Sequence, residues 1–432
     1  MPRAGGCTPW GREARLGETS WNGTSLAAAL AAQTAECNPE EEINVNSRYT
    51  VESIELSPAG QEARLSESLR GEIRKRIGER FDQPLLDTLR RKIRRELGAR
   101  SAELKVQKGS KPEHVKVVIQ ISEKKDESEF LVARLVYHSK QNWSFGADAT
   151  WRREGQNLRF GILTDNDELI ERYSGLRGGF ERRRIAGDHL RLRFDVETWR
   201  AQWNPATRVA LEQSPDVPGI YRTRFHFQPA ATVVFTEALT LSLGVSFQRL
   251  DTQFPAAYTE AATAAVSTLR YRQRWRRLPD HRHEVDAGYN LRTAARSLES
   301  DFVYTRHFWD ALYRYRSGRE RLAVSLMAGL LNGRAPLFER FVLGNSRTLR
   351  GWNKFDVDPL GGDRMVHGSI DHSYSDFRVV YDVGSTWRRG QPAKVRQSIG
   401  VGYGSKDGFT MLVAFPVKEG RLEPIFLMGV NF

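Results

Sequence analysis

The sequence predicts a mainly β protein: a 16-stranded antiparallel barrel that crosses a membrane, preceded by a small β-α-α-β-β domain. The longest uninterrupted apolar run, Leu26–Ala32, has seven residues, whereas a membrane-spanning helix needs ~20. A mean hydropathy of −0.54 is still compatible with membrane-spanning strands, because these alternate apolar and polar residues. From Phe130 to the C-terminus, alternating strands follow one another and no helix is expected.

Charge and cysteine content exclude several other classes. The chain has 66 Lys and Arg against 53 Asp and Glu, a net charge of +13. Cys7 and Cys37 are too few for a disulfide framework and lack the spacing of zinc ligands. Nucleic-acid binding is not expected, because the basic residues of 69–100 fall on the solvent-facing sides of predicted helices and no aromatic residues interleave with them.

Residues 1–45 show no sustained periodicity, and we predict a disordered or mis-started leader. Within them, Ser25–Ala32 follows two arginines and faintly matches the apolar core of an export signal. That core is mostly alanine and lies far from the start. A disordered or mis-started leader and an export signal both stay open as interpretations of residues 1–45.

Residues 46–125 predict a small domain with the order β-α-α-β-β. A strand at Arg48–Leu56 precedes two helices whose apolar residues recur every three or four positions. Two further strands are expected at Ala102–Val106 and His114–Ile121. With the Gly-Glu-Arg-Phe connection at Gly78–Phe81, this order and size resemble a POTRA domain.

Residues 126–432 predict the barrel. The clearest strand, Leu239–Phe247, places large apolar residues on one face and small polar ones on the other, and Arg321–Leu330 and Phe409–Val417 repeat the pattern. An even number of strands lets both ends of a single-chain bacterial barrel lie on the periplasmic side. The predicted strands lie near 129–139, 142–153, 157–164, 170–183, 188–203, 219–236, 239–250, 264–276, 281–294, 302–315, 319–331, 366–373, 376–387, 395–404, 408–417 and 424–432.

A ladder of charges favours a polar lumen over a soluble sandwich. One predicted strand carries four arginines on one face, and the next carries Glu284 and Asp286 on one face, so that the two strands can neutralise each other. A water-exposed sheet face with cross-strand ion pairs is the alternative. The four arginines are Arg270, Arg272, Arg274 and Arg276.

The longest connection, Asn332–Met365, has 34 residues and contains the sequence FVLGNSRTLRGW at Phe341–Trp352. This resembles the loop-six motif, Leu-Gly-Gly followed by (Val/Leu)-Arg-Gly-(Tyr/Phe), of the BamA/TamA superfamily of outer-membrane assembly factors. Asn345 stands in place of the second glycine. Further segments that resemble the family follow in order at Gly368–Asp371, Val379–Trp387, Gly400–Gly404, Ala414–Val417 and the terminal Phe432.

The resemblance implies two groups of site residues. It places Arg350 of the long connection against Asp371 and Asp382 on the following inner wall. Independently of the resemblance, the alternation of residues along the strand around Asp382 predicts that its side chain faces the lumen. The last strand would form a seam with the first strand and carry the terminal signal, although Leu427 stands where the family has a small glycine. The loop latch comprises Arg350, Gly351, Trp352, Asp371, Asp382 and Gly384, and the seam and terminal signal comprise Phe426, Met428, Val430 and Phe432.

The function implied by the resemblance is non-enzymatic and needs no cofactor. The protein would lie in the bacterial outer membrane with its POTRA-like domain in the periplasm, and would template or translocate client strands through the seam and the sheet edge of that domain. The implied partners are unfolded outer-membrane or secreted client polypeptides, outer-membrane lipid, and accessory periplasmic or lipoprotein subunits, without nucleic acid. The resemblance does not identify the client.

Two alternatives stay open: a transporter of the two-partner-secretion type for one dedicated secreted protein, and a passive or lipid-binding barrel. The second rests on the arginine-rich interior, which attracts anionic groups. A serine-hydrolase activity is not expected, because no Gly-x-Ser-x-Gly nucleophile elbow occurs. A metal site is not expected either. His281 and His283 share a strand face, but no third metal ligand is identifiable.

Overall fold

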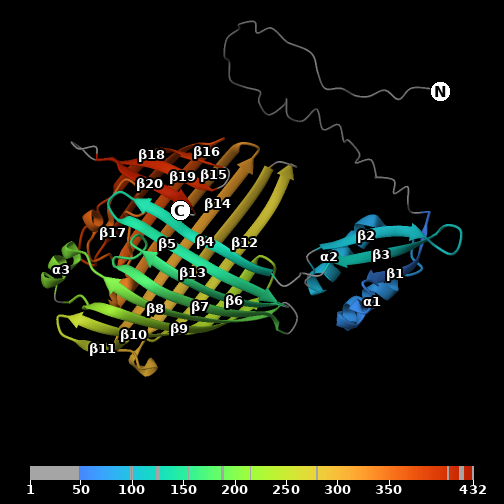
Figure 1. Ribbon diagram of the computed structural model, residues 1–432, viewed down its shortest axis with the longest axis horizontal. Coiled ribbons are helices and arrows are strands. Elements are labelled where there is room, and N and C mark those ends of the chain that lie inside the picture. Colours follow the sequence, from blue (N-terminus) through green and yellow to red (C-terminus); the bar gives the residue numbers. More distant parts are fainter. Residues whose placement is uncertain are drawn as a thin grey trace, which may run out of the picture.

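The structure is a computed structural model that describes residues 48–430 except 98, 100, 123–126, 154, 186–188, 215, 279–280, 406–407 and 418–422. The leader predicted for residues 1–45 and the terminal Phe432 therefore lie outside the described residues. A small α/β module comes first along the chain, followed by a closed barrel (Figure 1).

The module has the predicted order β-α-α-β-β, which is confirmed. Its strand β3 lies between the other two, parallel to β1 and antiparallel to β2. The apolar stripe of α2 is buried, and Ile93 packs in one core with Val117 and Ile119 of β3. Its elements are β1 (Thr50–Ser57), a 3-10 turn (Gln61–Arg64), α1 (Glu67–Arg76), α2 (Gln83–Leu97), β2 (Ser101–Lys108) and β3 (His114–Ser122).

Sixteen long antiparallel strands close the barrel within the described part of the chain, as predicted. An additional short strand, β11, pairs with one end of β10, and β12 pairs with the rest of β10. The strands are β4 (Glu127–His138), β5 (Asn142–Arg153), β6 (Gln156–Asp165), β7 (Arg172–Ile185), β8 (Leu190–Gln202), β9 (Ile220–Val234), β10 (Leu239–Phe254), β11 (Tyr258–Ala261), β12 (Ala264–Leu278), β13 (His281–Ala294), β14 (Val303–Ser317), β15 (Glu320–Arg334), β16 (Arg364–Tyr374), β17 (Phe377–Trp387), β18 (Arg396–Gly404), β19 (Phe409–Val417) and β20 (Ile425–Val430).

The expectation of no helix after Phe130 is wrong. The connection between β8 and β9 contains α3 (Pro205–Glu212), which the Asn204 side chain caps by accepting a hydrogen bond from the Ala206 N–H at 2.9 Å. Asn as N-cap followed by Pro in the first turn is a helix-start signal that strand counting overlooked. Single turns also occur at Arg296–Leu298, Leu337–Glu339 and α4 (Lys354–Val357).

Within the described residues, no helix has the length and apolar character needed to cross a membrane.

The barrel wall is apolar outside and polar inside. Large outward residues such as Leu243 and Leu326 are 51% and 60% exposed. On the inner face, Arg270 Nε donates to Asp286 Oδ1 at 2.6 Å and Arg272 Nε donates to Asp286 Oδ2 at 2.8 Å. The predicted neutralisation of one charged strand by the next is thus confirmed for Arg270 and Arg272, whereas Arg276 lies opposite Arg282 and has no acidic partner among the described residues.

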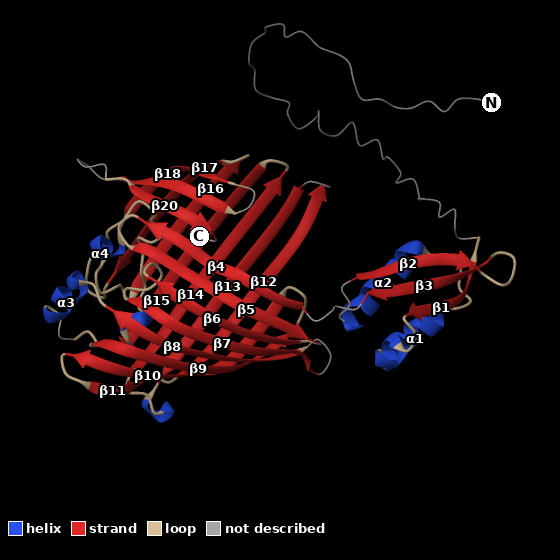
Figure 2. Cartoon of the chain, viewed as in Figure 1, coloured by secondary structure: helices blue, strands red, loops and turns tan. Residues whose placement is uncertain are grey.

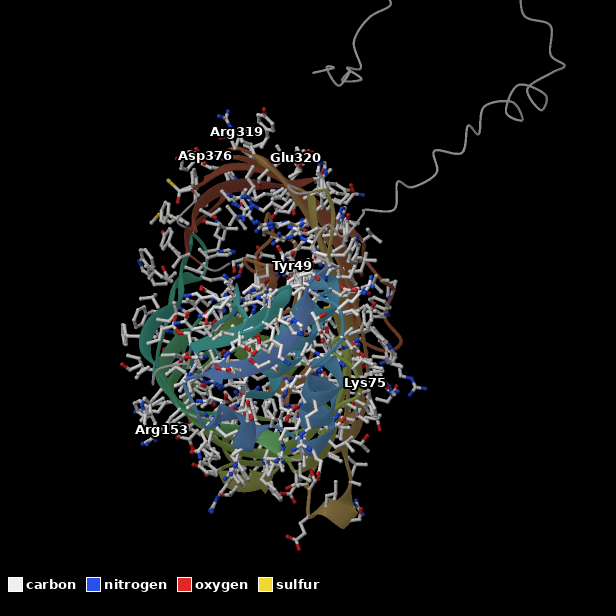
Figure 3. The ribbon with its side chains drawn as sticks, turned by 90° about the vertical axis from the view of Figure 1, so that its right-hand side faces the viewer. Tyr49, Lys75, Arg153, Arg319, Glu320 and Asp376 are labelled. Atoms are coloured by element: carbon white, nitrogen blue, oxygen red, sulfur yellow. The ribbon has the colours of Figure 1, made fainter. Side chains whose placement is uncertain are left out.

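The two ends of the barrel differ. Short turns connect the strands at the end where β4 begins, which is also the end beside the module (Figures 1 and 2). We call this the short-turn end, and Figure 3 looks toward it, with the turn residues Arg153, Arg319 and Asp376 at its rim. The opposite end, the loop end, carries α3 and the long connection 335–363.

Candidate functional site: the loop latch and the barrel seam

The connection 335–363 between β15 and β16, here called the long loop, folds into the lumen. Leu343 and Leu349 are fully buried and share one apolar cluster with the wall residues Ala264 and Tyr304. Ordering a loop of this length costs conformational entropy. The polar contacts described below help to offset that cost.

Arg350 at the loop tip binds two neighbouring strands of the inner wall. Its Nε and Nη2 donate to the two carboxylate oxygens of Asp382 on β17, at 2.9 and 2.8 Å. Its Nη1 donates to Asp371 Oδ2 on β16 at 3.0 Å, and its Nη2 also reaches Ser369 Oγ at 2.8 Å. The structure therefore brings together the three charged residues that the resemblance grouped.

The latch is buried and charge-balanced. Arg350 is 4% exposed and Asp382 is inaccessible. Burial alone would lower the pKa of the Arg350 guanidinium, but the hydrogen bonds and charges of Asp382 and Asp371 outweigh it and raise that pKa above its usual value. Arg378 of β17 also pairs with Asp371, with 2.9 Å from its Nε to Oδ1. Two arginines thus face two carboxylates.

The remaining motif residues set the close approach of loop and wall. A Cβ on Gly351 would lie 2.6 Å from the backbone carbon of Phe415, and one on Gly384 would lie 2.8 Å from the Val366 carbonyl oxygen, so both positions require glycine. Trp352 Nε1 donates to the Gln397 carbonyl of β18 at 2.8 Å. The motif therefore contacts the wall from β16 to β19.

A second anchor at Glu339 holds the start of the long loop. Arg292 Nη1 of β13 donates to Glu339 Oε1 at 2.6 Å, and Arg306 Nε of β14 donates to the Glu339 carbonyl at 2.9 Å. Burial would raise the pKa of the Glu339 carboxyl, but the two guanidinium charges lower it below its usual value. No sequence motif indicates Glu339.

A third anchor links the loop tip to the first barrel strand. Arg134 of β4 forms ion pairs with the buried Asp165 and Asp167 at the end of β6, and its Nη2 lies 3.3 Å from Ser346 Oγ. Ser346 in turn donates from its backbone N–H to Asp167 Oδ1 at 2.9 Å. The long loop is therefore attached to both sides of the first-to-last strand junction.

Lys354 belongs to the same anchor and is almost inaccessible, with 1% exposure. Its ammonium donates to the backbone carbonyls of Asn166 and Leu169 in the connection between β6 and β7. Burial lowers the pKa of Lys354 to about 8, although the nearby Asp167 and Asp165 oppose this shift. No sequence motif indicates Lys354 either; the only available signal is the group of acidic residues at the end of β6 and just after it.

In the part of the chain that the structure describes, the seam between β20 and β4 is the shortest pairing between two of the sixteen long strands. Within the described residues, four positions of β20, Leu427–Val430, pair with β4, whereas β4 pairs with β5 at eleven positions. The Ser139 N–H also donates to the Phe426 carbonyl at 2.9 Å. The earlier part of β4, Glu127–Leu131, has β5 on one side and no described strand on the other.

The predicted terminal residues lie along this seam. Phe426 points outward and is 53% exposed, Met428 pairs with Tyr137, and Val430 pairs with Leu135. Phe432 lies outside the described residues. The apolar Phe130, which is 74% exposed, lies on the stretch of β4 that pairs with β5 and has no described strand on its other side.

No group of three or more metal-ligating side chains occurs among the described residues. The two histidines considered as ligands instead contact tyrosines: His281 Nδ1 lies 2.8 Å from Tyr315 Oη, and His283 Nδ1 lies 2.9 Å from Tyr313 Oη. These four residues form part of an aromatic cluster.

The chain resembles known proteins at the level of sequence family and fold. A sequence-family model described as "Omp85 superfamily domain" matches residues 297–406, the region that holds the long loop and its wall partners. No match was found among curated proteins.

Solved structures resemble the whole fold. BamA from Haemophilus ducreyi lacking POTRA domains 1–3 matches with a TM-score of 0.60 and 15% identity, covering 89% of this chain and 85% of that one. CdiB from Escherichia coli matches with a TM-score of 0.52 and 10% identity, covering 89% and 77% of the two chains. CdiB from Acinetobacter baumannii matches with a TM-score of 0.53 and 9% identity, covering 89% and 74%. Residues 297–406 thus match an Omp85 superfamily domain, and the closed barrel with its preceding module has the fold of these solved structures.

Proposed function

We propose that the protein inserts client β-barrel polypeptides into the outer membrane by pairing client strands with the first barrel strand at the seam. The observation that carries this is the short junction of β4 and β20, beside a stretch of β4, Glu127–Leu131, that has no described strand on its β20 side. A strand that enters lipid with unpaired N–H and C=O groups costs several kcal/mol for each group. An exposed strand edge supplies those partners before the client leaves water.

The long loop supports this function by controlling where the barrel opens. Its Arg350 contacts β16 and β17 on one side of the seam, and its Ser346 contacts the Asp167 and Arg134 pair on the other. Elsewhere the strands are joined along most of their length. A barrel under strain therefore separates at the seam, while the loop keeps the two flanking walls in register from inside.

Export of one dedicated secreted protein through the lumen is the second candidate. A hollow of about 820 Å³ on the inner wall at the short-turn end favours it, because a polypeptide in transit needs polar space inside the barrel. An exported client crosses the membrane, whereas an inserted client ends inside the bilayer. The fate of the client therefore separates the two candidates.

Reconstitution tests the proposal. The full chain is placed in lipid vesicles, a urea-unfolded outer-membrane barrel protein is added, and the client's protease-protected, heat-modifiable fraction is followed in time. We expect folding to be at least ten-fold faster than in vesicles with an equal amount of an unrelated 16-stranded porin, which controls for bilayer defects. Equal rates in both vesicles would contradict insertion, and soluble client recovered inside the vesicles would support export instead.

A further inference from the structure

We propose that a row of arginines on the inner wall at the short-turn end binds acidic segments of polypeptide clients. We call Arg276, Arg282, Arg316 and Arg321 the arginine row. This inference rests on the proposed function, because it names the chemistry of the client that the barrel receives. It concerns a part of the lumen that neither the loop latch nor the seam uses.

The register of four consecutive strands builds the row. Arg276 of β12 is the direct cross-strand partner of Arg282 on β13. Arg282 is in turn the partner of Arg316 on β14, and Arg316 of Arg321 on β15. Neighbouring strands lie ~4.8 Å apart, so the row extends over about 14 Å. Like charges directly opposite each other destabilise a sheet.

The row lacks counter-charges among the described residues. No ion pair or hydrogen bond of these four guanidiniums occurs within the part of the chain that the structure describes, and three of the four side chains are exposed in the lumen. The acids nearby already have partners: Glu284 pairs with Arg274 and Arg314, and Asp371 pairs with Arg350 and Arg378. The row is therefore an uncompensated positive surface.

The same residues line the 820 Å³ hollow, which extends along the wall to Arg378 and Thr410. Figure 3 shows side-chain nitrogens gathered inside the barrel beneath the turns that carry Arg319 and Asp376. A concave site of one sign of charge with low-dielectric walls concentrates counter-ions. The row lies at the end beside the module, where a client arriving from the periplasm enters.

The surroundings favour an acidic peptide over other polyanions. The row alternates with Trp275 and Leu322, which face outward, so the guanidiniums face away from the bilayer and its headgroups. The aromatic residues that border the hollow, Trp275, His283 and Tyr315, occupy the alternate, outward positions of their strands. The neighbouring lumenal positions carry no aromatic residue on which a nucleic-acid base could stack: Arg274, Glu284, Arg314, Ala323 and Asp371. About four residues of extended chain, at ~3.3 Å each, match the length of the row.

Fluorescence anisotropy on the purified full chain in detergent tests the site. The probe is a fluorescein-labelled peptide of six Glu-Ser repeats, compared with Gln-Ser and Lys-Ser peptides and with a 12-nucleotide single-stranded DNA. We expect the Glu-Ser peptide to bind at least ten-fold more tightly than the Gln-Ser peptide at low salt, with affinity falling as salt rises. Tighter binding of the DNA than of the Glu-Ser peptide would overturn the assignment.

Matched variants locate the binding. Arg276→Gln/Arg282→Gln/Arg316→Gln should weaken Glu-Ser binding at least ten-fold. The control Arg208→Gln/Arg222→Gln/Arg389→Gln removes the same charge from exposed residues at the loop end and should stay within two-fold of the parent. The charge-retaining Arg276→Lys/Arg282→Lys/Arg316→Lys variant should keep most of the binding, and heat-modified migration checks that each barrel is folded.

Equal weakening by the control and the row variant would overturn the site, because the affinity would then depend only on the net charge of the protein. The vesicle insertion assay is a separate readout. A chain that binds the peptide through the row but fails to speed client folding contradicts the proposed function alone. Normal insertion without Glu-Ser selectivity contradicts the arginine row alone.

Discussion

Arg350 is a buried cation whose guanidinium donates four hydrogen bonds to two carboxylates and a hydroxyl on adjacent strands. Its planar fork suits this bidentate geometry, which a lysine cannot reproduce. Because Asp382 is also fully buried, removing either partner leaves an uncompensated charge inside the barrel. The latch is therefore a coupled pair.

The first prediction concerns this coupling. Arg350→Ala and Asp382→Ala should each lower the free energy of barrel unfolding by roughly 3–5 kcal/mol, and the double variant should cost clearly less than the sum of the two. Denaturant unfolding in detergent measures the cycle. Arg347→Ala, which removes an exposed arginine three positions earlier in the same loop, is the control and should be near neutral. Strictly additive losses would show that the two side chains do not act together.

Lys354 gives a prediction on pH. Its pKa of about 8 in the folded protein lies below the usual 10.5, so between pH 8 and 10.5 the folded state has released a proton that the unfolded state still binds. Stability from this group therefore rises with pH across that window, by about 1 kcal/mol per pH unit. Below pH 8 both states are protonated and the trend ends.

Unfolding midpoints at pH 7.5, 8.5 and 9.5 check this for the parent and for Lys354→Met. Subtracting the two profiles removes the titration of other groups. The unfolding midpoint of the parent minus that of Lys354→Met should increase as pH rises. A difference that is flat with pH would mean that Lys354 keeps its ordinary pKa in the folded protein.

At the scale of elements, the first strand carries the coupling between seam and loop. Arg134 lies on β4 close to the four-residue pairing with β20, and its partners Asp165 and Asp167 also hold the loop tip. β4 is thereby attached from inside at the point where its pairing with the last strand begins. If the seam opens as proposed, this ion-pair cluster has to move with β4.

The third prediction follows from that position. Arg134→Ala leaves Asp165 and Asp167 buried without their shared cation, so unfolding free energy should fall by about 3–5 kcal/mol. Arg152→Ala on the adjacent strand is the matched control, because it removes a half-exposed pair with Glu129, and such pairs contribute ~1 kcal/mol or less. Denaturant unfolding compares the two. Similar losses in both variants would rule out Arg134 as an anchor.

Sequence patterns predicted the barrel strands well, because each strand has one face toward apolar surroundings and one toward a polar lumen, and so shows a period of two. They missed α3, which is short and lies in a connection, and β11, which pairs with the end of β10 only. The resemblance grouped Arg350 with Asp371 and Asp382. It could not indicate Glu339 or Lys354, whose partners come from strands and connections far away in the chain, including backbone carbonyls that have no sequence signature.

At the scale of the whole molecule, the barrel has three regions that differ in how they are held together. Most of the wall is held by long strand pairings, the seam is held by a short one, and the long loop bridges the seam from inside. The arginine row lies on the inner wall at the short-turn end. A client would meet the row first and the edge of β4 next, so that binding and insertion are separate steps.

Locking the seam tests the central claim most directly. Tyr137→Cys/Met428→Cys places a disulfide across the direct partners of β4 and β20, and Val401→Cys/Val413→Cys places one across β18 and β19 as the control, both in a chain with Cys7 and Cys37 replaced by serine. Client folding in reconstituted vesicles is measured before and after reductant. The account predicts that the seam disulfide reduces the rate at least ten-fold and that reductant restores it, with the control unaffected. Unchanged client folding with the seam disulfide fully formed would contradict insertion through the seam.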